Sequence, residues 1–177
     1  MATEIARYDA SALVGLNVIV VNGAKEIIEV NGDHEQVSYV EVPNLEELSA
    51  AAALVRCMMP QKLLGSEIRA LRKIAGMTAR ELSEAMGGQP AIETISRWEN
   101  DHEFAGGYAE SVLRLAICER VKECAPGVDY SADKVNRVKL IGNGKQTKVP
   151  PAIELRRMLV RHDHRTNNSW TAELQAA

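Results

Sequence analysis

The sequence contains few aromatic residues, few cysteines and no long hydrophobic run, and each scarcity excludes a class of protein. No segment approaches the roughly 20 apolar residues of a membrane-spanning helix, and the N-terminus lacks the features of a signal peptide. We therefore expect a cytoplasmic protein with no membrane partner. Aromatic residues make up 4% of the 177 residues, so the core must be aliphatic and alanine-rich, which suits helices better than a large β-sandwich.

The cysteines and histidines form no recognisable catalytic or metal-binding pattern. Cys57, Cys118 and Cys124 include no CxxC pair, and we expect buried or half-buried thiols without a disulfide or a zinc site. His162 and His164 could bind a metal, but histidines two residues apart in a basic tail are more often incidental. Because the chain also lacks a glycine-rich phosphate loop, a nucleophile elbow and paired carboxylates, we expect no enzymatic activity, no metal and no cofactor.

Charge is distributed unevenly along a chain whose net charge is −3. Residues 1–64 carry a net charge of −5, residues 65–130 of −3 and residues 131–177 of +5. The basic residues 131–177 could contact phosphate, while the acidic residues 1–64 stay away from DNA or contact a basic protein partner. An ordinary solvated surface explains the same imbalance equally well.

Residues 16–42 are predicted to form a small antiparallel sheet. The runs LNVIVV, KEIIEV and QVSYVEV are rich in β-branched residues and are separated by Asn22-Gly23 and Asn31-Gly32, the strongest short-range signal for a hairpin. The following run, LEELSAAAALVRCMM, predicts a helix over residues 45–59 that ends at Pro60. A module of this kind is more suited to binding a ligand, a second copy or another protein than to catalysis.

The next segment predicts two helices separated by a tight turn. Ile68, Leu71, Arg72 and Ala75 share one helical face, with Ser66 as the expected N-cap and Gly76 as the stop. Thr78 is expected to cap the second helix, with Glu81 completing a capping box. The pair Gly87-Gly88 ends this second helix.

A third, short helix is expected to bury Ile92, Ile95 and Trp98. Its outward side would then present four polar residues, Glu93, Thr94, Ser96 and Arg97. Residues 89–91, which precede it, form either a longer turn or an extension of the helix. Outward positions on such a helix are where a recognition helix meets DNA bases.

The run IRALRKIAGMTARELSEAMGG followed by TISRWEN resembles the helix-turn-helix of the Cro/repressor (XRE) family. The resemblance implies that Arg72 pairs with Glu99 in a buried bridge and that Trp98 is a core residue. The strand-rich segment with NVIVVNG, a helix and then LLGSEIRALRK also resembles antitoxin-type transcriptional regulators, although the paired CxxC motifs of zinc-binding members are missing. The second resemblance covers about residues 8–120 and implies autorepression and neutralisation of a toxin.

Side-chain chemistry indicates how this segment would meet double-stranded DNA in the major groove. Arg97 offers a bidentate fork for guanine or phosphate, and Thr94 and Ser96 can bond either. Thr78 with nearby amides and Arg80 suit the phosphate backbone. The expected DNA-binding residues are Thr78, Arg80, Gln89, Glu93, Thr94, Ser96, Arg97 and Asn100.

Residues after the motif are expected to contribute to assembly and to charge. The run GGYAESVLRLAICERVKE predicts a helix with an apolar stripe of Val112, Leu115, Ala116 and Val121, which makes a dimer contact or packs on the helical core. Residues 133–149 suggest a hairpin, residues 152–165 a short basic helix, and residues from Thr166 onward a loose end. Four arginines could contact phosphate or simply be solvated: Arg156, Arg157, Arg161 and Arg165.

These patterns together predict an α+β protein in three parts. The parts are a strand-rich module with a helix at residues 1–62, an all-α helix-turn-helix domain at residues 63–126 and a basic, partly flexible extension at residues 127–177. The expected function is a sequence-specific, dimeric transcriptional regulator, either a repressor or an antitoxin-like autorepressor. The alternative is a protein-interaction module that binds a toxin or an activator and has weak or no specific DNA binding.

Overall fold

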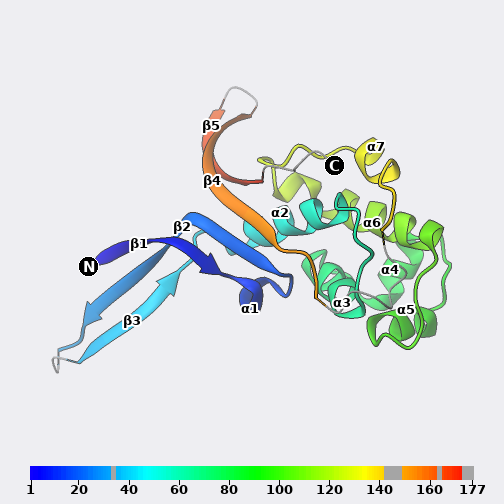
Figure 1. Cartoon of the computed structure of the whole chain (residues 1–177), viewed down its shortest axis with the longest axis horizontal. Coiled ribbons are helices and arrows are strands. Elements are labelled where there is room, and N and C mark those ends of the chain that lie inside the picture. Colours follow the sequence, from blue (N-terminus) through cyan, green and yellow to red (C-terminus); the bar gives the residue numbers. More distant parts are fainter. Residues whose placement is uncertain (33–34, 142–148, 163–164, 173–177) are drawn as a thin grey trace.

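The computed structural model describes residues 1–32, 35–141, 149–162 and 165–172, and it has a mixed α+β fold. Figure 1 shows a sheet on one side of the molecule and helices gathered on the other. The strands are β1 (Ala2–Asp9), β2 (Val18–Val30), β3 (Gln36–Glu41), β4 (Ile153–His162) and β5 (Arg165–Thr171). The helices are α1 (Ser11–Val14), α2 (Leu45–Cys57), α3 (Gly65–Ile74), α4 (Ala79–Ala85), α5 (Ile92–Glu99), α6 (Gly107–Val121) and α7 (Ala132–Asn136), with a 3-10 turn at Lys122–Cys124.

Strand β2 is the centre of a five-stranded sheet. Strand β1 pairs with it antiparallel, from Ala2 opposite Ile27 to Asp9 opposite Ile19. Residues 18–21 of β2 also pair with β4, in parallel, and residues 25–30 pair with β3, antiparallel. Because β5 pairs antiparallel with β4, segments from both ends of the chain belong to one sheet.

The prediction of a hairpin at Asn22-Gly23 is wrong, whereas strands do pair across Asn31-Gly32. Strand β2 runs continuously through Asn22, which adopts a φ of 51° beside a register shift in β1 between Ile5 and Arg7. A residue with positive φ can form a bulge as well as a turn, and β1 pairs with β2 on both sides of this point. The later Asn-Gly separates β2 from β3, in the predicted antiparallel pairing.

Helix α2 lies between the sheet and the other helices; its predicted start is confirmed, and it ends at Cys57, two residues before the predicted end. Asn44 caps its N-terminus by accepting a hydrogen bond from the backbone N–H of Glu47 at 3.3 Å. The run Ala50–Ala53 is buried together with Leu48 and Leu54, so small side chains allow close packing on two sides. Figure 1 shows the helix crossing the middle of the molecule next to β4 and α6.

The C-terminal part differs from the prediction of a basic helix and a loose end. Residues 153–162 form β4, in which Ile153 and Leu155 are buried while Glu154 and Arg156 are exposed, a period of two that suits a strand. The expected loose end includes β5, whose Trp170 is fully buried. The predicted hairpin at 133–149 includes α7 at its start, and residues 142–148 lie outside the described part.

Trp170 holds β5 against the N-terminal half of the chain. Its backbone N–H donates to Oε1 of Glu47 at 3.0 Å, and its indole Nε1 donates to the carbonyl oxygen of Pro43 at 3.1 Å. The guanidinium of Arg157 lies 5.9 Å from the centre of the indole ring, a cation–π distance. The C-terminal strand is therefore part of the hydrophobic core.

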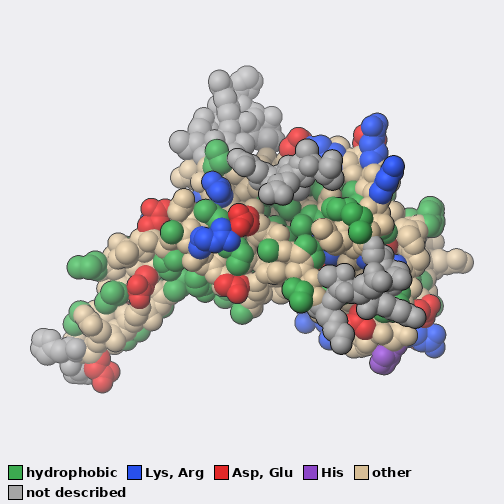
Figure 2. Space-filling model, in the orientation of Figure 1, with side chains coloured by type: hydrophobic (Ala, Val, Ile, Leu, Met, Phe, Trp, Pro, Cys, Tyr) green, Lys and Arg blue, Asp and Glu red, His purple; other side chains and the backbone are tan. Residues whose placement is uncertain are grey.

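The outer part of the sheet, formed by β1, the second half of β2 and β3, projects from the helical body (Figure 1). Every residue of β3 is exposed, and β1 is mostly exposed as well. Figure 2 shows hydrophobic and acidic side chains side by side on this projection. The exposed hydrophobic residues there include Val30, Val37, Tyr39 and Val40.

Candidate functional site

Helices α3, α4 and α5 carry the residues that the sequence analysis selected. Helix α3 contacts α5, and α4 contacts both α5 and α6. Ile68 and Leu71 of α3 and Ile95 of α5 are buried, in agreement with the predicted faces, and Leu82 of α4 is buried with them. Ile92, which was also expected inside, is 39% exposed and stands at the first position of α5.

An ion pair between Arg72 and Glu99 joins α3 to the end of α5, as the resemblance implied. Nε and Nη2 of Arg72 donate to the two carboxylate oxygens of Glu99 at 2.6 and 3.1 Å, and Nη1 donates to the carbonyl oxygen of Met77. The hydrogen bond with Glu99 raises the pKa of Arg72, so the guanidinium stays charged. Trp98, beside Glu99, is 5% exposed and belongs to the core, as expected.

The expected N-cap of α3 at Ser66 is wrong, since the helix begins at Gly65 with Leu64 as its cap. The backbone N–H of Leu64 donates to Oε2 of Glu67, and that of Gly65 donates to Oδ1 of Asp101. A Cβ atom at residue 65 would lie 2.5 Å from the carbonyl oxygen of Trp98. Only glycine fits this close approach between the start of α3 and the end of α5.

The N-terminus of α4 has the predicted capping box. Oγ1 of Thr78 accepts from the backbone N–H of Glu81 at 3.2 Å, and the backbone N–H of Thr78 donates to Oε2 of Glu81 at 2.7 Å. The hydrogen bond from the backbone N–H of Thr78, followed by the nearby Thr78 side chain, lowers the pKa of the Glu81 carboxyl group. The box fixes the angle at which the chain enters α4 after the turn at Gly76, whose φ is 66°.

The segment between α4 and α5 is a turn, which decides between the two alternatives that the sequence left open. Gly87 and Gly88 have φ angles of 92° and 81°, so the chain reverses there as a glycine permits. The hydroxyl of Ser83 donates to the carbonyl oxygen of Pro90 at 2.7 Å and holds the turn against α4. Gln89 therefore lies in this turn, before the start of α5.

The predicted DNA-binding side chains lie mostly at the surface. Thr94 is half-buried, and the other seven are exposed: Thr78, Arg80, Gln89, Glu93, Ser96, Arg97 and Asn100. Four of the eight belong to α5, two stand at the start of α4, and Gln89 and Asn100 flank α5. The structure thus gathers them on α4, on α5 and in the turns around them.

Besides Thr78, whose hydroxyl accepts from the backbone N–H of Glu81, two of these residues have partners within the chain. Asn100, the C-cap of α5, donates from Nδ2 to the carbonyl oxygen of Ser96 and accepts at Oδ1 from Nη2 of Arg69, each at 2.7 Å. The guanidinium of Arg97 lies 3.8 Å from the carboxylate of Glu103, and both side chains are about half exposed or more. Because that pair is loose and solvated, Arg97 can exchange it for another anion at little cost.

The charge of this surface is mixed. Besides Arg80 and Arg97, it carries the exposed carboxylates of Glu81, Glu84 and Glu93. Such a surface lacks the strongly basic character that produces sequence-independent affinity for phosphate. Contact with a nucleic acid would therefore depend on a few well-placed groups.

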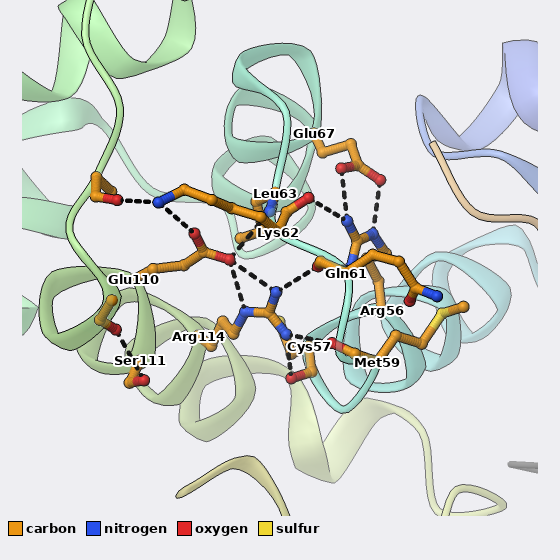
Figure 3. A network of polar contacts seen from close by, with 12 residues as sticks. Arg56, Cys57, Met59, Gln61, Lys62, Leu63, Glu67, Glu110, Ser111 and Arg114 are labelled. Atoms are coloured by element: carbon orange, nitrogen blue, oxygen red, sulfur yellow. Dashed lines mark hydrogen bonds and ion pairs between the residues drawn. The ribbon is translucent and has the colours of Figure 1, made fainter. Parts of the chain in front are cut away.

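A buried polar network, which the sequence analysis missed, fastens these helices to α2 (Figure 3). Arg56 of α2 makes two hydrogen bonds to Glu67 of α3, at 2.6 and 2.8 Å. Arg114 of α6 pairs with Glu110 at 2.7 Å and donates to backbone carbonyl oxygens after α2. All four side chains are at most 2% exposed.

One feature of the sequence, an arginine within each of two apolar helical segments, indicates this network. Arg56 and Arg114 stand among alanine, leucine and valine in segments predicted as helices, where a buried arginine needs several acceptors. Together the two guanidiniums bind the carbonyl oxygens of four residues at the end of α2 and in the connection to α3: Cys57, Met59, Gln61 and Lys62. The network fixes the connection between the strand-rich part and the three helices.

The apolar stripe predicted on α6 is displaced around the helix. Leu113, Ile117 and Val121 are buried, whereas Val112, Leu115 and Ala116 are half-buried. These three half-buried residues line an open groove of about 420 Å³ together with Met77 and Ala85. The displacement arises because α6 turns its buried face, including Arg114, toward α2.

The described residues contain no helix long and apolar enough to cross a membrane, and no cluster of three or more potential metal-ligating side chains.

The three cysteines are free. Cys57 and Cys118 are buried, as expected, whereas the exposure of Cys124 contradicts the expectation of a buried or half-buried thiol. The hydrogen bond with Cys57 and burial raise the pKa of the Cys118 thiol. The expected histidine pair lies outside the residues whose side chains the structure describes.

Comparison of the chain with protein-family models, with curated proteins and with solved structures gives no match.

Proposed function

We propose that this protein is a sequence-specific DNA-binding transcriptional regulator of the helix-turn-helix type, acting as a repressor or antitoxin-like autorepressor. The observation that carries the proposal is the exposed side of α5, where Ser96 and Arg97 are solvent-accessible while Ile95 and Trp98 are buried. In this proposal α5 enters the major groove. Arg97 bonds a guanine edge or a phosphate, and Thr94 and Ser96 bond neighbouring groups.

Helix α4 and its cap support the same arrangement. Thr78 and Arg80 are exposed at the start of α4, and the ion pair of Arg72 with Glu99 holds α3 and α5 together. Contacts from Thr78 and Arg80 to phosphate would set the register, while contacts from α5 would read the sequence. Gln89, Glu93 and Asn100 complete the proposed interface.

The proposed regulator binds DNA as a homodimer. A single short helix buries little surface, and two copies on paired half-sites gain both affinity and specificity. The groove beside α6 is the proposed contact because its floor is apolar and its rim carries Glu119 and Arg120, charges that a two-fold axis could pair reciprocally. Analytical ultracentrifugation of Leu115→Glu against the wild type tests this contact, and a wild-type monomer both with and without DNA would contradict it.

Fluorescence anisotropy with the DNA upstream of the gene, against scrambled DNA of equal length, tests the function. We expect tight, sequence-dependent binding that weakens steeply with salt. Arg97→Ala should weaken binding about 10-fold or more, because a good guanine or phosphate contact contributes roughly 1–3 kcal/mol. The matched control is Arg137→Ala at the C-cap of α7, where the arginine is exposed and forms an i,i+4 pair with Asp133. Equal, salt-insensitive binding of both DNAs would contradict the proposal.

A second candidate function is a protein-interaction module that binds a toxin or an activator. It is favoured by the projecting part of the sheet, where Val37, Tyr39 and Val40 are exposed on a strand that, among the described residues, pairs only with β2. Glu29, Glu35 and Glu41 make the same region acidic, so a basic protein would be its complement. Weak, sequence-blind DNA binding would favour this function.

A further inference from the structure

A cleft of about 610 Å³ lies among α1, the start of α2 and α3. Figure 1 shows α1 and α3 on the same side of α2, so residues far apart in the sequence meet there. Its volume falls in the range of roughly 300–1,000 Å³ that is typical of small-molecule sites. None of the eight residues proposed to contact DNA lines this cleft, so it is a separate feature of the molecule.

The apolar lining of the cleft contains two large side chains that the fold leaves exposed. Leu13 of α1 is 48% exposed and Leu45 of α2 is 39% exposed, and both border the cleft. Val14 and Ile74 line it as well. Apolar surface on two facing elements favours an aliphatic group between them.

The polar lining is basic on one side. Arg69 and Lys73 stand one helical turn apart on α3 and both border the cleft. Glu46 of α2 also borders it, but the ion pairs of the described residues include none between Glu46 and either cation. Lys73 is exposed and takes part in none of those ion pairs, so its ammonium group is available to an anion.

We propose that this cleft binds a carboxylate with an aliphatic chain and that its occupancy lowers the affinity for DNA. The carboxylate would meet Lys73 and Arg69, and the chain would lie against Leu13 and Leu45. Arg69 connects the cleft to the C-terminal end of α5. Its Nη2 donates to Oδ1 of Asn100 at 2.7 Å, and its Nε lies 3.5 Å from Oε2 of Glu99. A ligand that competes for Arg69 loosens the C-terminal end of α5.

The coupling to DNA rests on the proposed function, whereas binding in the cleft does not. By linkage, a ligand that weakens DNA binding must itself be weakened by DNA to the same extent. Asn100 bonds both Arg69 and Ser96, so a change at Arg69 reaches the exposed side of α5 through two hydrogen bonds. The two parts of the proposal can therefore be measured separately.

Isothermal titration calorimetry of the full chain with decanoate tests the cleft. We expect saturable binding of decanoate, with no binding of decylamine, which has the same chain and the opposite charge, or of acetate, which lacks the chain. Lys73→Ala should weaken the affinity about 5- to 10-fold, since it removes a charge-assisted contact at a partly solvated site. Glu46→Gln should strengthen it about 2-fold by removing a repulsion, while the control Lys25→Ala, on the exposed part of β2, should leave it unchanged.

Failure of decanoate to bind, equal binding of decylamine, or equal affinities of Lys73→Ala and Lys25→Ala would overturn the proposed site. For the coupling, saturating decanoate should weaken DNA binding of the wild type at least about threefold, and Lys73→Ala should need proportionately more decanoate for the same effect. Bound decanoate with unchanged DNA affinity would overturn the coupling. Absence of DNA binding even without decanoate would instead count against the proposed function and leave the calorimetric result on the cleft standing.

Discussion

Two arginines of the same short motif differ sharply in what surrounds them. The side chain of Arg72 is 17% exposed and makes three hydrogen bonds within the chain, whereas that of Arg97 is 63% exposed and has a loose partner at 3.8 Å. A buried arginine with its acceptors satisfied holds elements together, and an exposed one is free to meet a ligand. Residue type alone therefore does not separate a structural role from a binding role.

This contrast predicts that replacement of Arg72 lowers the stability of the protein much more than replacement of Arg97. Arg72→Met should lower the free energy of unfolding by about 3 kcal/mol, because Glu99 would remain as a nearly buried carboxylate that keeps the longer contact with Arg69, at 3.5 Å, and loses the bidentate one. Arg97→Ala should lower it by less than about 0.5 kcal/mol, since an exposed ion pair contributes little. Urea denaturation of both variants beside the wild type measures the difference, and similar losses for the two would contradict this assignment of roles.

At the scale of elements, the cap of α4 determines where the three-helix unit changes direction. Thr78→Ala should lower the free energy of unfolding by about 1 kcal/mol, because it leaves the backbone N–H of Glu81 without its acceptor. Thr78→Ser keeps a hydroxyl at the same position, so it should lower the free energy of unfolding by only about a few tenths of a kcal/mol. Thermal denaturation of the two variants side by side provides the measurement, and equal losses would show that the methyl group, not the hydroxyl, matters.

The same capping box predicts a dependence on pH. The contact with Thr78 lowers the pKa of Glu81 in the folded chain below its ordinary value of 4.5, so the unfolded chain binds the proton more readily. The stabilisation is therefore complete well above pH 4.5 and is lost as the pH falls through the folded value. Glu81→Gln should be less stable than the wild type at pH 7, and the difference should shrink below pH 4.5. A difference in unfolding free energy that stays constant between pH 7 and pH 3 would contradict this assignment.

At the scale of the whole molecule, the C-terminal strands complete the core. A Cβ atom at residue 23 would lie 2.6 Å from the ring of Trp170, so the indole of β5 approaches β2 as closely as a glycine allows, across β4. Gly23→Ala should destabilise the protein by about 2 kcal/mol through overpacking against a fully buried indole. Gly32→Ala, with open space around residue 32, should change stability by less than about 0.5 kcal/mol. Chemical denaturation of both variants tests this prediction. Equal stabilities of the two variants would show that the indole of Trp170 can move away from residue 23 without cost.

The same packing changes how the basic tail should be examined. Removal of the residues after 127 would also remove Ile153, Leu155 and Trp170 from the core, so loss of DNA binding in such a truncation would only report unfolding. Arg156→Gln, on an exposed position of β4, keeps the strand and removes one charge. A change in the salt dependence of DNA binding in this variant would assign the tail a role at phosphate.

Local sequence predicted the helices of the middle region and most of the candidate site. Capping residues, apolar periodicity and paired glycines act within a few residues, so they indicated α2, α4, the Thr78 and Glu81 box and the exposed side of α5. The Arg72 and Glu99 pair came from the resemblance. The N-cap of α3 is Leu64, two residues before the predicted Ser66. The backbone N–H of Gly65 donates to Asp101, a partner that the local sequence does not reveal.

The sequence by itself determined which segments are helices in residues 45–121 and the apolar faces of α3 and α5, except at Ile92, whereas the buried face of α6 was decided by its packing against α2. Only the tertiary structure decided that Asn22-Gly23 is crossed by a continuous strand, that residues 153–162 form a strand, and that Trp170 is buried. In each case the partner comes from a segment distant along the chain, such as Val18 opposite Ile153. Strand pairing and burial depend on that partner, whereas a helix satisfies its backbone hydrogen bonds within its own residues.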